Sequence, residues 1–397
     1  MNFISKNMFS AFTALTMLLT GCAGGNSSAG SESEISQTEE QVMELTQKTF
    51  AADEQHVKLI GRTLNENGTL WLALSASGFE FTMTGTSASV TVLGDNRITS
   101  DTAKSRFAAY VDGEKVLDEM VTQEQQTFTI FTSETEKEVT IKLLKLSEAA
   151  ESIMGISSID VVSTGDIAPT AEKELKIEFI GDSITCGYGV DDEVKENHFN
   201  TETEDATKAY AYKTAMALDA DYSLVSYSGH GIVSGYTTVG KKVAAQQVPN
   251  LYTMFARSYG NYNGMNVSSY EWDFSRFVPD LVVINLGTND SSYTGNKEEL
   301  IREYIDGYVK FLGTVREKNP DAHIICALGV MGDGLYNAVC TAVEEYSAAT
   351  GDTKVSAFHF KPQDGSTGFA ADWHPTAATH DIAAEAITAE IKTILGL

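Results

Sequence analysis

The hydrophobic pattern divides the chain into stretches of different character. Between residues 57 and 162, apolar side chains often recur at every second position, as at Phe79 and Phe81. Turn-forming pairs such as Asp112-Gly113 separate these runs. Many short alternating runs with turns every ~8–12 residues are typical of an all-β sandwich. No group of candidate catalytic side chains lies in this stretch.

The pattern changes after about Gly165. Five short, almost continuous apolar runs now alternate with longer segments in which apolar residues recur at helical spacing. This alternation is typical of a parallel sheet covered on both faces by helices. Ligands of such sheets bind at the carboxyl ends of the strands. The predicted strands are 177–180, 224–227, 281–286, 324–328 and 355–360, and the predicted helices are 208–218, 298–317, 335–349 and 376–395.

The first 22 residues differ from the rest of the chain. They contain one charged side chain, Lys6, and an apolar run at 8–19 that is too short to cross a bilayer well. We interpret residues 1–22 as a signal peptide. The run ends in LTGC, which resembles the bacterial lipobox, so we expect Cys22 to be acylated; an ordinary signal peptide with an unrelated cysteine is the alternative. The expected location is extracytoplasmic, at a bacterial cell surface or in the periplasm, with membrane contact through the lipid anchor alone.

Residues 23–52 are rich in Gly, Ser, Glu and Gln and contain few apolar side chains. Such a composition is typical of a flexible tether. Within it, the spacing of apolar residues favours a short helix at 39–49. We expect a β-sandwich domain at 53–165 and an α/β domain at 166–397. A chain of 397 residues accommodates two domains at ~100–200 residues each.

The composition narrows the range of partners. The formal net charge is −27, and such a surface repels nucleic acid and anionic membranes. It suits a neutral ligand, although a solvated acidic surface is the plainer interpretation. Apart from Cys22 there are three cysteines, Cys186, Cys326 and Cys340, an odd number that does not form a disulfide framework and allows at most one pair. Their spacings match no zinc motif, so we expect no metal site.

Polar clusters lie where the rule for parallel sheets predicts a site. The sequence GDSIT begins at Gly181, directly after the first predicted strand, and GTND begins at Gly287, directly after the third. DWHP begins at Asp372, between the last strand and the last helix, and a weaker cluster, SGHG, begins at Ser228 after the second strand. Each cluster alone is commonly a turn or a loop. Their common position at strand ends favours a shared site.

The clusters contain the parts that acyl transfer requires. Ser183 can act as the nucleophile and His374 as the base that takes its proton. The backbone N–H groups of Ser183 and Gly229, with the side-chain amide of Asn289, can form an oxyanion hole, in which the loss of one donor costs ~3–4 kcal/mol. Gly229 suits this role because a residue without a Cβ lets the backbone approach a ligand closely. The sequence therefore predicts a serine esterase.

Three neighbours of these residues are interpreted as structural. Asp182 and Asp290 are expected to organise their loops, since the side chain of Asp182 cannot serve both the turn and the base. Cys186 lies three residues after Ser183 and is interpreted as a buried small side chain.

The clusters resemble the sequence blocks of the SGNH, or GDSL-type, hydrolases. GDSIT looks like their first block, Gly229 like the glycine of the second, GTND like the third, and His374-Pro375 like the fifth. The longer strings GDSITCGYGV, at 181–190, and YSGHG, at 227–231, are similar to carbohydrate esterase family 2, in which a β-sandwich precedes the hydrolase domain. The resemblance covers roughly residues 57–397.

The resemblance implies an α/β fold with an N-terminal jelly roll followed by a flavodoxin-like hydrolase domain. It implies an acetyl xylan esterase-like enzyme that removes O-acetyl groups from plant-type polysaccharides such as xylan and glucomannan, without a metal or organic cofactor. The expected partner is thus an acetylated polysaccharide or oligosaccharide. We expect a monomer with no nucleic-acid partner.

One position departs from the family pattern. The wider SGNH pattern has an Asp three residues before the His, where this chain has Ala371. Asp372 lies two residues before His374, and residues two apart share one side of an extended segment. In some members of family 2 a backbone carbonyl orients the His. We therefore predict a Ser183–His374 dyad and leave open whether Asp372 or a backbone carbonyl orients the base.

Other side chains are candidates for substrate contact. Trp373, beside the base, offers a flat apolar face to a sugar ring, and His230 follows the oxyanion glycine. The loop at 255–272, which contains Tyr262 and Trp272, is predicted to form a wall of the cleft. Ordinary packing is the alternative for the aromatic residues, and a surface position is the alternative for His230.

Two further functions are considered besides deacetylation of polysaccharides. A lipid-directed esterase or thioesterase could use the same site, but long acyl chains need an apolar trough and the hydrolase half contains no extended apolar insertion. A non-catalytic glycan-binding lipoprotein is the other alternative. The joint presence of Ser183, Gly229, Asn289 and His374 argues against a silent site.

Overall fold

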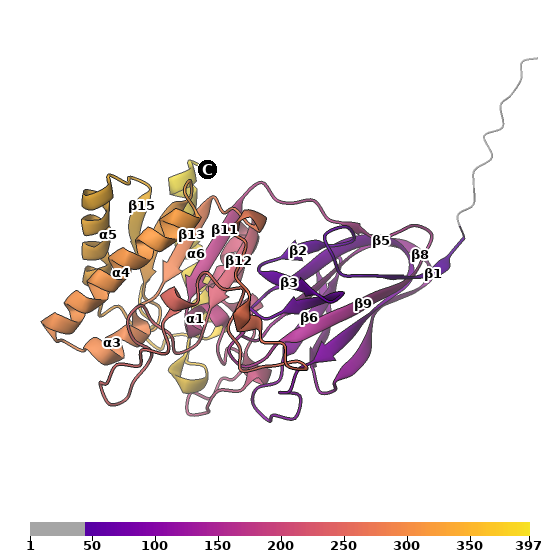
Figure 1. Ribbon diagram of the computed structural model, residues 1–397, viewed down its shortest axis with the longest axis horizontal. Helices are drawn as coiled ribbons and strands as arrows, with labels where there is room; N and C mark the ends of the chain where they lie inside the picture. Colours follow the sequence, from indigo (N-terminus) through magenta and orange to yellow (C-terminus); the bar gives the residue numbers. More distant parts are fainter. Residues whose placement is uncertain (1–43) are drawn as a thin grey trace, which may run out of the picture. The chain divides into compact units, whose positions relative to one another are not determined.

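The described part of the chain contains a β-rich domain followed by an α/β domain (Figure 1). The structure is a computed structural model and describes residues 44–397. The predicted signal peptide, the predicted lipidation at Cys22 and most of the predicted tether lie outside these residues. Within residues 44–397, no helix combines the length and apolar character needed to cross a membrane.

One antiparallel sheet forms the first domain. Its strands follow the order β3-β4-β9-β5-β8-β6-β7, with β1 paired to β9, and β2 and β10 paired to β5. Apolar side chains from one face of these strands form a single buried cluster, so the sheet curves around its own core. The strands are β1 (Thr46–Phe50), β2 (Lys58–Ile60), β3 (Thr63–Glu66), β4 (Thr69–Leu72), β5 (Gly78–Gly94), β6 (Arg106–Val111), β7 (Glu114–Met120), β8 (Gln125–Lys145), β9 (Met154–Ser163) and β10 (Ala168–Pro169).

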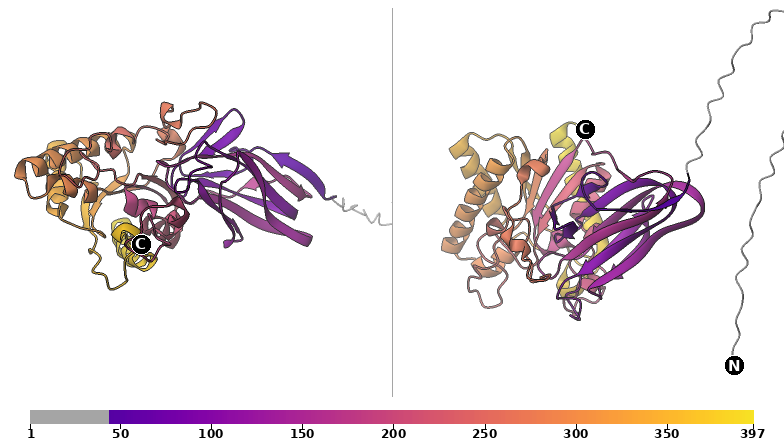
Figure 2. Two further views of the ribbon diagram at one scale, coloured as in Figure 1. Left: turned by 90° about the horizontal axis from the view of Figure 1, so that it is seen from below. Right: turned by 45° about the vertical axis from the view of Figure 1, so that its right-hand side comes forward.

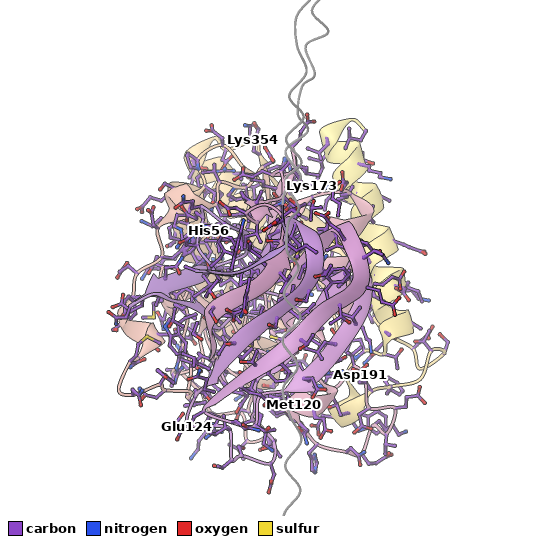
Figure 3. The ribbon with its side chains drawn as sticks, turned by 90° about the vertical axis from the view of Figure 1, so that its right-hand side faces the viewer. His56, Met120, Glu124, Lys173, Asp191 and Lys354 are labelled. Carbon is purple, nitrogen blue, oxygen red and sulfur yellow. The ribbon has the colours of Figure 1, made fainter. Side chains whose placement is uncertain are left out.

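The long strand β5 keeps its apolar side chains on the core face by changing register. Phe79 and Phe81 are buried in its first half, and Val90 and Val92 are buried in its second half. Two irregularities in the pairing of β5 with β8 lie between these pairs. A bulge shifts the alternation by one residue, so odd positions before it and even positions after it face the same core. Figure 3 shows the curved strands of this sheet, with Met120 of β7 at one of its ends.

The segment before residue 52 differs from its prediction. Residues 46–50 form strand β1, which pairs with residues 159–163 of β9. The predicted helix at 39–49 is therefore wrong in its described part, and the predicted tether ends before residue 46. Beyond the part of β9 that pairs with β4, strand β1 supplies backbone partners for residues 159–163. Thr and Phe side chains also favour a strand.

The α/β domain has a five-stranded parallel sheet in the order β12-β11-β13-β14-β15. This order, 2-1-3-4-5 within the domain, is that of the flavodoxin-like fold, whose ligands bind where the strand order reverses. That point lies between β11 and β13, which precede GDSIT and GTND. The predicted fold class is confirmed. The strands are β11 (Lys176–Gly181), β12 (Asp221–Ser226), β13 (Leu281–Asn285), β14 (His323–Leu328) and β15 (Val355–His359).

Helices cover both faces of the parallel sheet (Figure 2). The apolar sides of α4 and α5 join one buried cluster, and those of α2 and α6 join the other. All four predicted helices are confirmed within two residues at each end, whereas the short helices α1 and α3 lack an apolar repeat and were not predicted. The helices are α1 (Ser183–Cys186), α2 (Tyr210–Ala217), α3 (Thr288–Thr294), α4 (Glu298–Lys318), α5 (Tyr336–Thr350) and α6 (Ala377–Leu395).

Candidate active site

The nucleophile candidate lies at a sharp turn between β11 and α1. Ser183 is the first residue of α1 and is buried. Asp182 caps this helix, because its Oδ1 accepts a hydrogen bond of 3.0 Å from the backbone N–H of Ile184. The predicted structural role of Asp182 matches this geometry. The cap holds Ser183 at the carboxyl edge of the sheet.

His374 lies directly against Ser183. Its Nε2 is 2.9 Å from the Oγ of Ser183, and its Nδ1 is 3.1 Å from the backbone oxygen of Ala371. A carbonyl can only accept, so Nδ1 carries the proton and Nε2 presents its lone pair to the hydroxyl of Ser183. Burial lowers the pKa of His374 to about 4. The imidazole is therefore neutral at neutral pH, as a base must be.

The carboxylate of Asp372 turns away from His374. It accepts hydrogen bonds from the Tyr188 hydroxyl at 2.6 Å and the Phe199 N–H at 3.1 Å, and its Oδ1 is 2.8 Å from Nδ1 of His198. Of the two alternatives left open by the sequence, the structure has the backbone carbonyl behind the base, so Asp372 is not the orienting residue.

The backbone explains why Asp372 turns away. Both Asp372 and Trp373 have positive φ angles, +50° and +63°. The segment before His374 is therefore not extended, and residues two apart in it do not share a side. Left-handed backbone costs of order 1–3 kcal/mol for a residue other than glycine. Residues 371–373 form a tight turn that aims a carbonyl, instead of a carboxylate, at His374.

Tyr188 is a site residue that the sequence did not reveal. Its ring stacks on the imidazole of His374, with centroids 3.9 Å apart and an interplanar angle of 20°. Burial makes the larger contribution, and the neighbouring Asp372 carboxylate the smaller one, to a raised pKa of the Tyr188 hydroxyl. The hydroxyl thus stays protonated and donates to Asp372, which fixes the ring over the base. Only its position within the family-like string GDSITCGYGV could have drawn attention to it.

Two backbone donors are free beside the nucleophile. Gly229 has φ +73°, a left-handed conformation that favours glycine. Within residues 44–397, no atom accepts a hydrogen bond from the backbone N–H of Ser183 or of Gly229. Both N–H groups are therefore available to a ligand oxygen, as an oxyanion hole requires.

Asn289 belongs to the same cluster, but its amide is occupied. Its Nδ2 lies 3.1 Å from the Oδ2 of Asp182 and 2.8 Å from the backbone oxygen of His230. An amide nitrogen has two hydrogens, so donation to an oxyanion requires the exchange of one of these bonds. Asn289 as the third oxyanion donor stays a prediction. Burial raises the pKa of Asp182 to about 7.

Asp290 organises the neighbouring loop, in agreement with its predicted structural role. Its carboxylate accepts hydrogen bonds from the backbone N–H groups of Ile232, Val233 and Ser234 at 2.8–3.0 Å. Burial raises the pKa of Asp290 to about 6, and these three bonds oppose the shift. The loop that follows Gly229 is thereby tied to α3.

His230 is buried, so the surface alternative is wrong for it. Its Nδ1 lies 2.8 Å from the backbone oxygen of Ser228, and its Nε2 has no partner among residues 44–397. Burial lowers the pKa of His230. Contact between His230 and substrate stays a prediction.

The aromatic candidates divide into two groups. Trp373 is half exposed directly beside His374, with the Nζ of Lys195 4.0 Å from its ring centroid. Trp272, in contrast, is buried between the guanidinium groups of Arg62 and Arg276, 5.3 and 5.2 Å from its ring. Contact between Trp373 and substrate stays a prediction, whereas the buried Trp272 is not exposed to a ligand.

The loop at 255–272 packs on the β-sandwich. Trp272 lines a cavity of about 390 Å³ together with Lys176 and Asp221, which begin β11 and β12 at the opposite edge of the sheet from Ser183. The ring of Tyr262 contacts that of Trp71 of β4 in a tilted arrangement, with centroids 4.8 Å apart. The predicted cleft wall is wrong for Trp272, because a large aromatic side chain serves equally well in an interface between domains. For Tyr262 it stays a prediction.

Two other kinds of chemistry, a metal centre and a reactive thiol, were considered for the described residues. Within residues 44–397, no three His, Cys, Asp or Glu side chains converge to hold a metal ion. Cys186 is a buried free thiol whose pKa is raised well above its ordinary value by burial.

Comparison with protein families identifies both domains. Residues 59–170 match the model for the carbohydrate esterase 2 N-terminal domain, and residues 179–382 match the GDSL-like lipase/acylhydrolase family. The second match places the GDSIT, SGHG, GTND and DWHP clusters within one family domain.

Curated and solved relatives agree with these matches. The chain is 35% identical over 328 residues to cellulase/esterase CelE of Acetivibrio thermocellus, covering 82% of this chain and 38% of that protein, so it spans well under half of that relative. It is 26% identical to an acetylxylan esterase / glucomannan deacetylase of Cellvibrio japonicus, covering 87% of this chain and 91% of that protein. A family two carbohydrate esterase from Clostridium thermocellum, solved in complex with cellohexaose, is 34% identical and covers 86% of this chain and 99% of that chain with a TM-score of 0.74. The chain belongs to carbohydrate esterase family 2.

Proposed function

We propose that the protein is a serine esterase that removes O-acetyl groups from plant cell-wall polysaccharides such as xylan and glucomannan. The observation that carries this proposal is the hydrogen-bonded series from Ser183 through His374 to the Ala371 carbonyl. Beside it lie two backbone N–H groups, those of Ser183 and Gly229, that have no acceptor among residues 44–397. This arrangement brings together a nucleophile, a neutral base and two donors for an oxyanion.

In the first step, His374 takes the hydroxyl proton of Ser183 while the Oγ attacks the acetyl carbonyl carbon. The carbonyl oxygen becomes an oxyanion and accepts hydrogen bonds from the N–H groups of Ser183 and Gly229. The C–O bond to the sugar then breaks, and His374 gives its proton to the departing sugar oxygen. The products are a free sugar hydroxyl and acetyl-Ser183.

In the second step, a water molecule attacks acetyl-Ser183 by the same series of proton transfers. His374 takes a proton from the water as its oxygen attacks the acetyl carbon, and the same N–H groups hold the oxyanion. Ser183 leaves with the proton from His374, and acetate is released. The Ala371 carbonyl keeps the imidazole in one tautomer throughout.

The carbohydrate substrate class rests on the relatives and on Trp373. Two curated relatives are named for esterase or deacetylase activity, and a solved one holds cellohexaose. The exposed ring of Trp373 gives a sugar an apolar platform next to the base. A glucan or xylan chain along this ring would bring its acetyl groups to Ser183.

Acetate release from acetylated xylan, glucomannan and cello-oligosaccharide tests the proposal, with NMR to identify the position that loses its acetyl group. We expect release by the wild type and a loss of about 10⁴-fold or more in Ser183→Ala. Activity on p-nitrophenyl esters should fall steeply from acetyl to octanoyl. The opposite order would indicate a lipid esterase, and glycan binding without acetate release would indicate a non-catalytic binding protein.

We also propose that the protein is exported, anchored by a lipid at Cys22 and monomeric. The support is the apolar run at 8–19 and the LTGC sequence that follows it. Expression in a bacterial host with an alkyne-labelled fatty acid should label the wild type and not Cys22→Ser. Light scattering after chromatography tests the monomer.

A further inference from the structure

One buried carboxylate of the β-sandwich domain, that of Glu148, contacts a loop of the active site. Glu148 follows β8, the longest strand of the sandwich. Its Oε2 accepts a hydrogen bond of 2.8 Å from the backbone N–H of Ser228. Ser228 precedes Gly229, whose own N–H is one of the two free donors beside the nucleophile. The carboxylate thus holds the peptide next to an oxyanion donor.

The same oxygen also contacts the helix that carries the nucleophile. Oε2 of Glu148 lies 3.9 Å from the Sγ of Cys186, the last residue of α1. That Sγ is in turn 3.2 Å from the hydroxyl of Ser226, at the end of β12. Ser183, at the start of α1, supplies the other free N–H. One side chain of the sandwich therefore touches both segments that supply the oxyanion donors.

Glu148 is itself held by a buried polar cluster. Its backbone N–H donates to the Oε2 of Glu204 at 2.8 Å, and its carbonyl accepts from the Nζ of Lys145 at 2.9 Å. All three side chains are buried. Burial raises the pKa of Glu148 to about 7 and lowers that of Lys145 to about 8. Burying such groups is costly unless hydrogen bonds or opposite charges compensate for the lost solvent.

An oxyanion donor needs this kind of support. It must point at an oxygen 2.7–3.1 Å away, and a glycine loop has the least intrinsic stiffness of any segment. The loop after Gly229 is tied down by Asp290. On the near side of Gly229, the described side chain that accepts from the loop backbone at Ser228 is Glu148.

We propose that Glu148 is a positioning residue: it holds the Tyr227–Ser228 peptide, and thereby orients the next peptide so that the Gly229 N–H faces the oxyanion. The sandwich is then part of the catalytic apparatus. This inference rests on the proposed function, since it concerns the oxyanion of that esterase reaction.

Three substitutions at Glu148 test the proposal. Glu148→Gln keeps an acceptor oxygen at the same reach, whereas Glu148→Met keeps the length and removes the acceptor. Glu148→Asp keeps the charge and withdraws the acceptor by one methylene. On p-nitrophenyl acetate, we expect kcat to fall about 10- to 100-fold in Glu148→Met and Glu148→Asp, with KM within twofold of the wild type, because loss of a whole oxyanion donor lowers kcat about 10²–10³-fold. Glu148→Gln should keep kcat within about threefold.

A tetrahedral inhibitor separates positioning from a general loss of structure. Phenylboronic acid forms a tetrahedral adduct on a catalytic serine, and its inhibition constant should rise in the Met and Asp variants in proportion to the loss of kcat, but not in Glu148→Gln. If Glu148→Met does not fold, the comparison of Asp with Gln decides the question. Wild-type kcat in a folded Met or Asp variant, a change confined to KM, or equal impairment of Gln and Met would each overturn the proposal.

Glu178 of β11 supplies the matched control. It is an equally buried glutamate at the boundary between the domains, paired with Arg62. Glu178→Gln should lower thermal stability and leave kcat within twofold. An inactive wild type, or full activity in Ser183→Ala, would instead refute the proposed function. The outcomes that overturn the role of Glu148 all require an active wild type, so the two failures are distinguishable.

Discussion

Charged side chains are buried at two places on the boundary between the two domains, and their partners differ between the two places. Beside β11, Arg62 faces Glu178 at 3.2 Å and donates to two backbone carbonyls, and the Tyr252 hydroxyl donates to the other oxygen of Glu178. Beside the dyad, Glu148, Glu204 and Lys145 are all buried, but within residues 44–397 they form no ion pair, and the Nζ of Lys145 donates to the backbone oxygens of Ser147 and Glu148. The first place pairs opposite charges directly, and the second does not.

This difference indicates that the first place contributes to stability and the second to the catalytic reaction. A buried pair of opposite charges holds two domains in one arrangement and is costly to break. Buried titratable groups whose lost solvation is not fully compensated by partners have shifted pKa values. Such groups are often found at functional sites. Four groups with shifted pKa values, Glu148, Asp182, Asp290 and His374, lie at or beside the carboxyl edge of the parallel sheet. We therefore expect substitutions at the first place to change stability and those at the second to change rate.

The largest expected effect is at the first place. Arg62→Met leaves the carboxylate of Glu178 buried without its partner, so the free energy of unfolding should fall by about 3–5 kcal/mol. The kcat of the folded variant should stay within about twofold of the wild type. Urea unfolding followed by fluorescence, and kinetics on p-nitrophenyl acetate, measure the two quantities. A large loss of kcat with little loss of stability in Arg62→Met would contradict the assignment of the first place to stability alone.

The second prediction concerns the pH dependence of the dyad. Burial lowers the pKa of His374 from 6.5 to about 4, so the base stays neutral at all pH values above that. The acid limb of kcat/KM, which reports groups of the free enzyme, should therefore lie near pH 4. Activity should fall as pH decreases through this value, because a protonated His374 cannot take the proton of Ser183. An acid limb near 6.5 would mean that water reaches the imidazole.

The fold explains which site residues could be predicted from the sequence and which could not. Ser183, Gly229 and His374 could be predicted because the ends of parallel strands meet at one edge, and the polar clusters at those ends are visible in the sequence. The orientation of Asp372 could not, because it depends on positive φ angles at Asp372 and Trp373 that no pattern of residue types reveals.

Contacts made by distant segments were also invisible. Glu148 lies 80 positions before Ser228, and only the docking of the sandwich brings them together. Aromatic composition at 255–272 suggested a cleft wall, yet the same composition serves packing between domains. Residue type predicted the chemistry of the site, and tertiary structure determined which side chains support it.

A smaller effect is expected at Tyr188, whose ring shields the imidazole. Tyr188→Leu removes the stacked ring, and we expect kcat to fall about 10-fold, which corresponds to about 1.4 kcal/mol. Tyr188→Phe keeps the ring and loses only the hydroxyl that donates to Asp372, so its kcat should fall less. The two rates on p-nitrophenyl acetate measure the contribution of the ring.

The pH profile of the same variants shows whether the ring acts through His374. Loss of the ring exposes the imidazole, so the acid limb should move from near 4 toward 6.5 in Tyr188→Leu and stay in place in Tyr188→Phe. A 10-fold loss of kcat with an unmoved limb would contradict shielding of the base.

The smallest expected effect compares two tryptophans at opposite edges of the sheet. Trp373 is half exposed beside the base, whereas Trp272 is buried between two guanidinium groups. An aromatic contact contributes about 0.5–1.5 kcal/mol, so Trp373→Ala should raise KM for acetylated polysaccharide about 2- to 10-fold. The KM for p-nitrophenyl acetate should not change, because that substrate has no sugar ring. Trp272→Phe should leave both KM values unchanged; an increase for polysaccharide in this variant would mean that a glycan chain extends from the dyad to the far edge of the sheet.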